Sequence, residues 1–192
     1  MHKDLPNFFI FTDEYNNEIF RNKNRNIGVI YRNYKAKNRA EELLKIAKAC
    51  KKCRYQLFIS NDIKLAYRFK ADGIYIPSFN KKNKFLNLEK KNIKIIGSAH
   101  SQKEIKEKIE QKCIAIFLSP LFFVNKSKNN LGLHKFNYLV YLNKINFFAL
   151  CGISKKNINM LKLLQIKGFG GIQIFKKKPA YKRPVFLKNN FF

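Results

Sequence analysis

Acidic residues are scarce in this sequence. Its 192 residues include 12 aspartates and glutamates against 40 lysines and arginines, which gives a formal net charge of +28. Such a surplus attracts anions, including phosphorylated metabolites, nucleic acid and acidic membrane surfaces. Lysine and asparagine are abundant along the whole chain, however, so a general compositional bias also explains the charge. The partner must therefore be argued from motifs.

Long hydrophobic runs are absent, and cysteine is rare. No apolar stretch approaches the roughly 20 residues that span a bilayer. The first residues, Met1–Pro6, lack the long apolar core of a signal peptide. We therefore expect a cytoplasmic protein with free thiols. Cys50 and Cys53 have the spacing of a redox or metal pair, but no second pair completes a zinc site, which favours two incidental thiols.

Short apolar runs recur at a steady pace along the chain. Each is nearly continuously apolar, which is typical of strands that are buried on both faces of a parallel sheet. The eight runs are Phe8–Phe11, Ile27–Tyr31, Tyr55–Ile59, Gly73–Ile76, Ile93–Gly97, Cys113–Leu118, Phe147–Leu150 and Gly171–Phe175.

Helical patterns lie between these runs. Arg39–Cys50 carries an apolar stripe at helical spacing, and Asn38 precedes it as a capping residue. Ser101 and Glu104 have the spacing of a capping box, which predicts a helix through Glu110. Further helices are predicted over Leu133–Ile145 and Ser154–Ile166.

The alternation of strands and helices predicts a single compact (β/α)8 TIM barrel over residues 1–175. A doubly wound open sheet is the structural alternative. In a closed barrel the first and last strands are neighbours. Residues 176–192 form a basic, aromatic tail, which suits an anionic surface or single-stranded nucleic acid, or else packs its phenylalanines over the barrel.

The most informative polar residues follow the third run. Asn61 and Asp62 come directly after it, before a short helical segment and the next strand. Barrels and open α/β sheets place their chemistry at the carboxyl ends of their strands. A carboxylate beside an amide suits a hard metal ion and phosphate oxygens. As an alternative, Asp62 caps the helix that begins at Ile63.

The order of the polar motifs resembles the thiamine phosphate synthase / TenI family from Phe8 to Phe175. The similar segments are Thr12-Asp13, Tyr31-Arg32-Asn33-Tyr34-Lys35, Asn61-Asp62 with Lys70–Tyr75, Gly97-Ser98-Ala99-His100, Ser119–Phe122 with Lys126 and Lys128, and Ala149–Asn157. Each segment follows or ends a predicted strand.

This resemblance implies a barrel transferase of thiamine biosynthesis. It joins a hydroxymethylpyrimidine diphosphate to a thiazole phosphate and releases pyrophosphate with the help of Mg²⁺. Asn80 stands where the family has a second metal-binding aspartate. The residues that the resemblance implies are Arg32, Asn61 and Ser98 for catalysis, Lys35, Lys126, Lys128, Gly152 and Gly171 for substrate phosphates, and Asp62 and Asn80 for the metal.

Other interpretations remain open at this point. The chain could be a divergent TenI-like barrel, either a thiazole tautomerase or a binder of another small phosphorylated ligand. The loop Ser119–Phe122 contains no histidine that could act as the acid or base of a tautomerase, which argues against that activity. It could also be a non-catalytic basic binding module, although no dedicated nucleic-acid motif is present. Arg32 could be a solvated cation, and Ser98 a small residue required for packing. No membrane partner is expected, and the sequence leaves the oligomeric state open.

Overall fold

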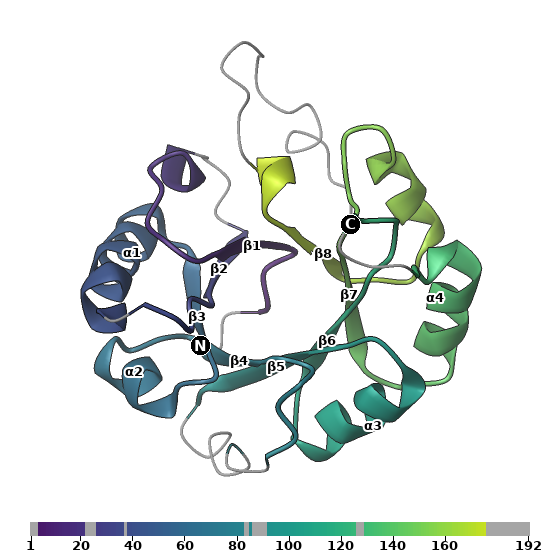
Figure 1. The fold of residues 1–192 in the computed structure, drawn as a ribbon, viewed down its shortest axis with the longest axis horizontal. Coiled ribbons are helices and arrows are strands. Elements are labelled where there is room, and N and C mark those ends of the chain that lie inside the picture. The colour runs from purple at the N-terminus through teal and green to yellow at the C-terminus, as the bar shows by residue number, and fades with distance from the viewer. Residues whose placement is uncertain are drawn as a thin grey trace.

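Eight parallel strands close into a barrel in a computed structural model that describes residues 4–21, 26–36, 38–82, 85, 92–125 and 129–175. The helices lie outside the ring of strands (Figure 1). The strands are β1 (Phe8–Thr12), β2 (Ile27–Tyr31), β3 (Gln56–Ser60), β4 (Gly73–Ile76), β5 (Lys94–Ala99), β6 (Ala115–Leu118), β7 (Asn146–Leu150) and β8 (Gly168–Gly171). The helices are α1 (Arg39–Cys53), α2 (Ile63–Arg68), α3 (Gln102–Glu110) and α4 (Gly132–Tyr141), with 3-10 helices η1 (Ile19–Arg21), η3 (Ile158–Leu163) and η4 (Gln173–Phe175).

The barrel closes between its first and last strands. β1 pairs in parallel with β2 on one side and with β8 on the other, and Ile10 lies opposite Gly171. The predicted TIM barrel is therefore confirmed, and the open-sheet alternative is wrong. Lys126, Lys128 and the tail 176–192 lie outside the described residues.

Two buried cores lie on either side of the strands. Successive side chains of a strand point to opposite faces, so β1 divides its residues between the two cores. Phe8 and Ile10 face the helices, whereas Phe9 and Phe11 face the barrel interior. The interior cluster consists of Phe9, Phe11, Ile30, Phe58, Tyr75, Ile96, Ala115, Phe117 and Phe148.

Aromatic rings fill the barrel interior, where branched aliphatic residues usually dominate. The ring of Phe9 meets those of Phe58, Phe117 and Phe148 edge to face, with centroids 5.3, 5.0 and 5.1 Å apart. These partners come from β3, β6 and β7, so contacts cross the barrel between strands that are not neighbours. Each such pair contributes about 0.5–1.5 kcal/mol beyond the area that it buries.

The position predicted for the last strand was wrong. The prediction began at Gly171, whereas β8 ends there and Gln173–Phe175 forms η4. Glycine is unfavourable in strands, which hides β8 from a search for apolar runs. A Cβ atom at Gly168 would lie 1.8 Å from the carbonyl oxygen of Asn7. Glycine is therefore required where β8 approaches the chain before β1.

Two helix predictions also need correction. Asn38 makes no capping hydrogen bond to α1; its side chain donates to Glu41 instead. The helix predicted over Ser154–Ile166 is a turn followed by the 3-10 helix η3. The buried residues Ile158 and Leu161 of η3 and Leu164 directly after it recur every third position. That spacing fits the three residues per turn of a 3-10 helix.

The described residues contain neither a candidate membrane-spanning helix nor a disulfide bond. Within them, no helix combines the length and the apolar character needed to cross a membrane. All four cysteines are free thiols, as predicted. Burial raises the pKa of Cys50, and the thiol of Cys53 donates to the carbonyl oxygen of Phe20 over 3.3 Å.

Substitution of Gly168 by alanine tests the basis of barrel closure. The added methyl group would meet backbone atoms of Asn7 that no side-chain rotation can move, so Gly168→Ala should destabilise the fold by about 3 kcal/mol or more. Gly132→Ala is the matched control. Gly132 has φ +63° but open space around a Cβ, so only the cost of about 1–2 kcal/mol for the left-handed backbone is expected. Urea unfolding measures both. Equal losses would contradict this account of closure.

Candidate active site

The residues that the sequence placed at the site gather at one end of the barrel. Because all strands are parallel, their carboxyl ends share one mouth. The residues that follow or end strands there are Arg32 after β2, Asn61 and Asp62 after β3, Asn80 in the loop after β4, Ser98 near the end of β5, Gly152 after β7 and Gly171 at the end of β8. The structure thus brings these seven together; Lys35 lies exposed in the loop after β2.

Arg32 lies over the aromatic interior at this mouth. Its guanidinium carbon is 5.6 Å from the centre of the Phe11 ring, and its Nε donates to Asp13 Oδ1 over 3.2 Å. The side chains of Arg32 and Asp13 are 36% and 56% exposed. An ion pair as exposed as this contributes at most about 1 kcal/mol. Arg32 is therefore held only loosely by Asp13, and its fork of donors suits phosphate oxygens.

The two carboxylate oxygens of Asp62 bind two different groups. Its Oδ1 accepts from the backbone N–H of Leu65 over 3.0 Å and so caps α2. Its Oδ2 accepts from Arg39 Nη1, also over 3.0 Å. Arg39 further donates to the carbonyl oxygen of Ser60 over 3.1 Å. The capping alternative is therefore confirmed, and each carboxylate oxygen keeps capacity for another ligand.

Arg39 is a site residue that sequence reasoning missed. Its guanidinium carbon lies 5.5 Å from the ring centre of Tyr31 and 5.9 Å from that of Tyr34. Arg39 is the first residue of α1 and reads in sequence as a solvated helix start. Its spacing from Asp62 carries no local signal, because the two residues meet only when β2, α1 and β3 are assembled.

Tyr34 occupies the space beside the carboxyl end of β3. Its hydroxyl shares a hydrogen bond with the Ser60 hydroxyl, and burial raises its pKa. The ring of Tyr34 meets that of Phe79 edge to face, with centroids 5.9 Å apart. Phe79 is 66% exposed and belongs to the loop after β4. Two aromatic side chains therefore stand at the mouth beside the cations.

Ser98 links β4 and β5 at the mouth. Its Oγ accepts from the backbone N–H of Ser78 over 3.0 Å. A further hydrogen bond joins Ser98 to the hydroxyl of Tyr75, whose pKa is raised by burial inside the barrel. Ser98 is only 4% exposed. Its first effect is therefore to fix the start of the loop that leads to Asn80.

Two residues with left-handed backbone follow β7. Cys151 and Gly152 have φ +70° and +73°. A Cβ at Gly152 would lie 2.5 Å from the carbonyl oxygen of Phe122, so the turn requires glycine for both conformation and space. The side chain of Asn157 stabilises this turn with two hydrogen bonds. Its Nδ2 donates to the Gly152 oxygen and its Oδ1 accepts from the Ser154 N–H, each over 2.8 Å.

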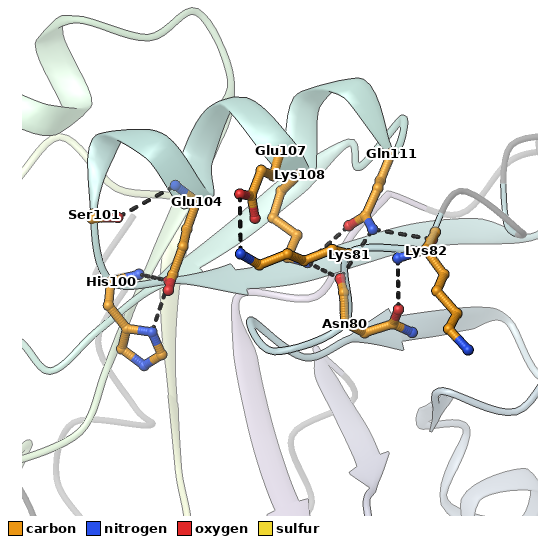
Figure 2. A network of polar contacts seen from close by, with 9 residues as sticks. All are labelled: Asn80, Lys81, Lys82, His100, Ser101, Glu104, Glu107, Lys108 and Gln111. Carbon is orange, nitrogen blue, oxygen red and sulfur yellow. Dashed lines mark hydrogen bonds and ion pairs between the residues drawn. The ribbon is translucent and has the colours of Figure 1, made fainter.

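Asn80 joins the mouth to helix α3. Its side-chain Nδ2 donates to Asn61 Oδ1, and its own Oδ1 accepts from the backbone N–H of Lys82 over 2.9 Å. Its backbone oxygen points the other way and accepts from Lys108 Nζ over 2.7 Å and from Gln111 Nε2 over 3.0 Å (Figure 2). Asn80 is 7% exposed, so both of its ends are fixed by bonds within the protein.

The oxygen atoms at the mouth are too few to hold a metal ion without further oxygen ligands from a bound phosphate group. In the part of the chain that the structure describes, no group of three or more histidine, cysteine, aspartate or glutamate side chains lies together. Asp62 offers one carboxylate, and Asn61 and Asn80 offer amide oxygens. Mg²⁺ is usually held by one or two carboxylates together with substrate phosphates. The residues therefore fit a Mg²⁺ ion that is bound partly by phosphate, and not one held by protein groups alone.

The fold and its mouth define a TIM-barrel protein with arginine, amide and carboxylate groups around an aromatic floor. The sequence model of the family described as thiamine monophosphate synthase matches residues 19–174. The chain belongs to this family.

Named relatives agree with this assignment. A thiamine-phosphate synthase of Prochlorococcus marinus subsp. pastoris is 32% identical over 129 residues, which cover 66% of this chain and 37% of that protein. The chain therefore spans little more than a third of that relative's length. A thiamine-phosphate synthase of Pediococcus pentosaceus is 26% identical over 156 residues, which cover 77% of this chain and 72% of that protein.

A solved structure has the same fold. The thiamine phosphate pyrophosphorylase from Pyrococcus furiosus superposes with a TM-score of 0.70 over 88% of this chain and 86% of that chain. The two are 19% identical, so the likeness establishes the shared barrel fold.

The double role of Asp62 predicts different stabilities for two variants. Asp62→Ala removes both the cap of α2 and the partner of Arg39, so it should cost about 1–2 kcal/mol. Asp62→Asn keeps a capping oxygen, since asparagine caps about as well as aspartate, and should cost less than Asp62→Ala. Denaturant unfolding of both variants measures the difference. An equal loss would show that the cap contributes nothing.

Proposed function

We propose that this protein joins a hydroxymethylpyrimidine diphosphate to a thiazole phosphate and releases pyrophosphate, giving thiamine phosphate. The observation that carries the proposal is the convergence of Arg32, Asn61 and Asp62 at the mouth of a barrel of this family. The match to thiamine-phosphate synthases over 66% and 77% of the chain supports the same reaction.

The reaction needs charge stabilisation more than proton transfer. When the bond between the pyrimidine carbon and the diphosphate oxygen breaks, negative charge accumulates on the leaving pyrophosphate. Fixed cations and hydrogen-bond donors that face this charge lower the barrier, because they are already oriented before the reaction. Arg32 supplies a forked donor beside the aromatic floor, and Lys35 supplies a second cation in the same loop.

The aromatic groups at the mouth complete the proposed site. Phe11 and Tyr75 close the floor beneath Arg32, and their rings meet edge to face at 5.4 Å. A pyrimidine ring placed over this floor would have its diphosphate directed toward Arg32. The apolar floor also excludes water from one side of the reacting carbon, which strengthens the interaction of Arg32 with the departing charge.

Mg²⁺ is the cofactor that we propose, with Asp62 as its carboxylate ligand and Asn80 as the adjoining amide. A bound Mg²⁺ would neutralise charge on the leaving pyrophosphate. In the structure Asp62 is paired with Arg39, and Asn80 with Asn61. Gly152 and Gly171 are proposed to hold the phosphate of the thiazole, and Lys126 or Lys128 to neutralise the charge of the pyrophosphate.

The proposal predicts opposite effects for two substitutions at the metal site. Asp62→Asn keeps the cap of α2 but removes the carboxylate, so turnover should fall by about 100-fold or more. Asn80→Asp adds a second carboxylate and should lower the Mg²⁺ concentration that gives half-maximal rate, because a hard cation binds a charged oxygen more tightly. The measurement is the rate of thiamine phosphate formation from the two phosphorylated precursors, titrated with Mg²⁺.

Glu110→Gln serves as the control for charge removal, because Glu110 is exposed at the end of α3. It should leave rate and Mg²⁺ requirement unchanged. Full activity in Asp62→Asn, or an unchanged Mg²⁺ requirement in Asn80→Asp, would refute the metal site. No turnover by the wild-type chain at any Mg²⁺ concentration would refute the proposed reaction.

A further inference from the structure

Helix α3 and its C-capping residue Gln111 hold the loop after β4 with three side chains. Lys108 and Gln111 both donate to the backbone oxygen of Asn80, and Gln111 Nε2 also donates to the oxygen of Lys82 over 3.1 Å. Glu107 forms an ion pair with Lys81 at 3.6 Å. Figure 2 shows these side chains directed from α3 toward the loop. The segment 80–82 is therefore attached to the helix at each of its three residues.

Lys108 is the unusual member of this group. Its side chain is 0% exposed, although lysine is almost never fully buried unless paired. Its hydrogen-bond partners are the neutral oxygens of Asn80 and of Gln111 Oε1, at 2.7 and 2.8 Å. Removing an ammonium group from water costs several kcal/mol. A hydrocarbon side chain would avoid that cost, so stability alone does not account for lysine here.

The surroundings of Lys108 are adapted to it. A Cβ atom at Gly97 would lie 2.9 Å from Lys108 Cδ and 3.0 Å from Cys113 Sγ. Glycine on the outer face of β5 therefore leaves the channel through which the lysine stem passes beneath the loop. At the end of the stem, Gln111 orients the ammonium group and shares its acceptor.

Asn80 connects this buried ammonium group to the mouth. The backbone oxygen of Asn80 meets Lys108, while its side-chain Nδ2 meets Asn61 Oδ1 on the opposite side. Asn61 directly precedes Asp62. The chain of contacts thus runs from α3 through one residue to the carboxylate–amide pair at the end of β3.

We propose that Lys108 is a positioning residue for the diphosphate end of the site, acting through Asn80. This inference rests on the proposed function. By donating to the backbone oxygen of Asn80, Lys108 fixes the backbone of this residue and so keeps its side chain directed toward Asn61. Without it, the Asn80 side chain samples other rotamers, and the amide oxygens around Asp62 lose their fixed arrangement. The effect should reach the diphosphate and the metal but not the thiazole phosphate, which is proposed to bind at Gly152 and Gly171.

The kinetic test replaces Lys108 with methionine, which keeps an unbranched stem and removes the ammonium group. Lys108→Met should raise KM for the pyrimidine diphosphate and the half-saturating Mg²⁺ concentration by about tenfold, the size of effect seen when a supporting residue of a metal site is lost. KM for the thiazole phosphate should stay within about twofold by the same reasoning. In an Asn80→Ala background, Lys108→Met should add nothing further, because no Asn80 side chain remains to be oriented.

Lys106→Met is the matched control, because Lys106 lies on the same helix and is exposed. It removes the same charge without touching the loop and should leave every constant unchanged. A loss of stability alone would lower the active fraction of Lys108→Met and so its apparent kcat, without a selective rise in one KM. That result would overturn the positioning role.

A second measurement does not depend on turnover. The backbone N–H of Lys82 donates to Asn80 Oδ1, so its hydrogen exchange reports the position of the Asn80 side chain. Lys108→Met should speed exchange at Lys82 by about tenfold or more while the amides of α3 keep their protection. If Lys108→Met does not fold, Lys108→Gln tests the same attachment, because its shorter side chain also lacks the ammonium group, and it should give the same local change.

The two measurements separate this inference from the proposed function. A wild-type protein without turnover refutes the proposed function, and the exchange of Lys82 still decides whether Lys108 orients Asn80. A wild-type protein that turns over, with KM values and Lys82 exchange unchanged in Lys108→Met, overturns the positioning role alone.

Discussion

The close approach of β8 to the chain before β1 is the constraint on which the barrel and its mouth depend. At Gly168 a single methyl group would overlap the Asn7 oxygen, and at Gly170 it would meet the rings of Phe11 and Phe117. Glycine in β8 therefore lets the last strand close the ring while the interior phenyl groups pack. Closure in turn brings eight carboxyl strand ends to one rim, so residues as distant in sequence as Arg32 and Gly152 share a site.

Asp13 and Asp62, two carboxylates at the mouth, differ in how firmly their partners hold them. Asp13 is more than half exposed in its pair with Arg32, so an incoming phosphate group can replace it at small cost. Asp62 is 29% exposed and its partner Arg39 is 18% exposed. Arg39 also donates to the backbone oxygen of Ser60, so the Arg39–Asp62 pair is a fixed part of the barrel rim. If a diphosphate binds here as proposed, Arg32 would exchange its Asp13 partner for a phosphate oxygen while Asp62 stays in place.

The sequence revealed the parts of the structure that local patterns determine. Buried parallel strands are continuous apolar runs, which is why seven of the eight strands were located, and polar residues that follow such runs must lie at the mouth. β8 was misplaced because its glycines are selected by a contact with Asn7, not by strand propensity. Arg39 and Lys108 were missed for a related reason. The contacts of Arg39 with Asp62 and of Lys108 with Asn80 join residues that are distant in sequence. A lysine on a helix that is rich in charged residues is also expected to be exposed.

The charge around Asn80 follows from two differences that act in the same direction. An amide stands where the family resemblance places a carboxylate, and a lysine ammonium group lies buried beneath it. Both make the local potential more positive, and low exposure keeps solvent from screening it. A diphosphate anion is attracted by such a potential. Under the proposed function, the charge around Asn80 therefore favours binding of the diphosphate, and Mg²⁺ would bind together with that anion.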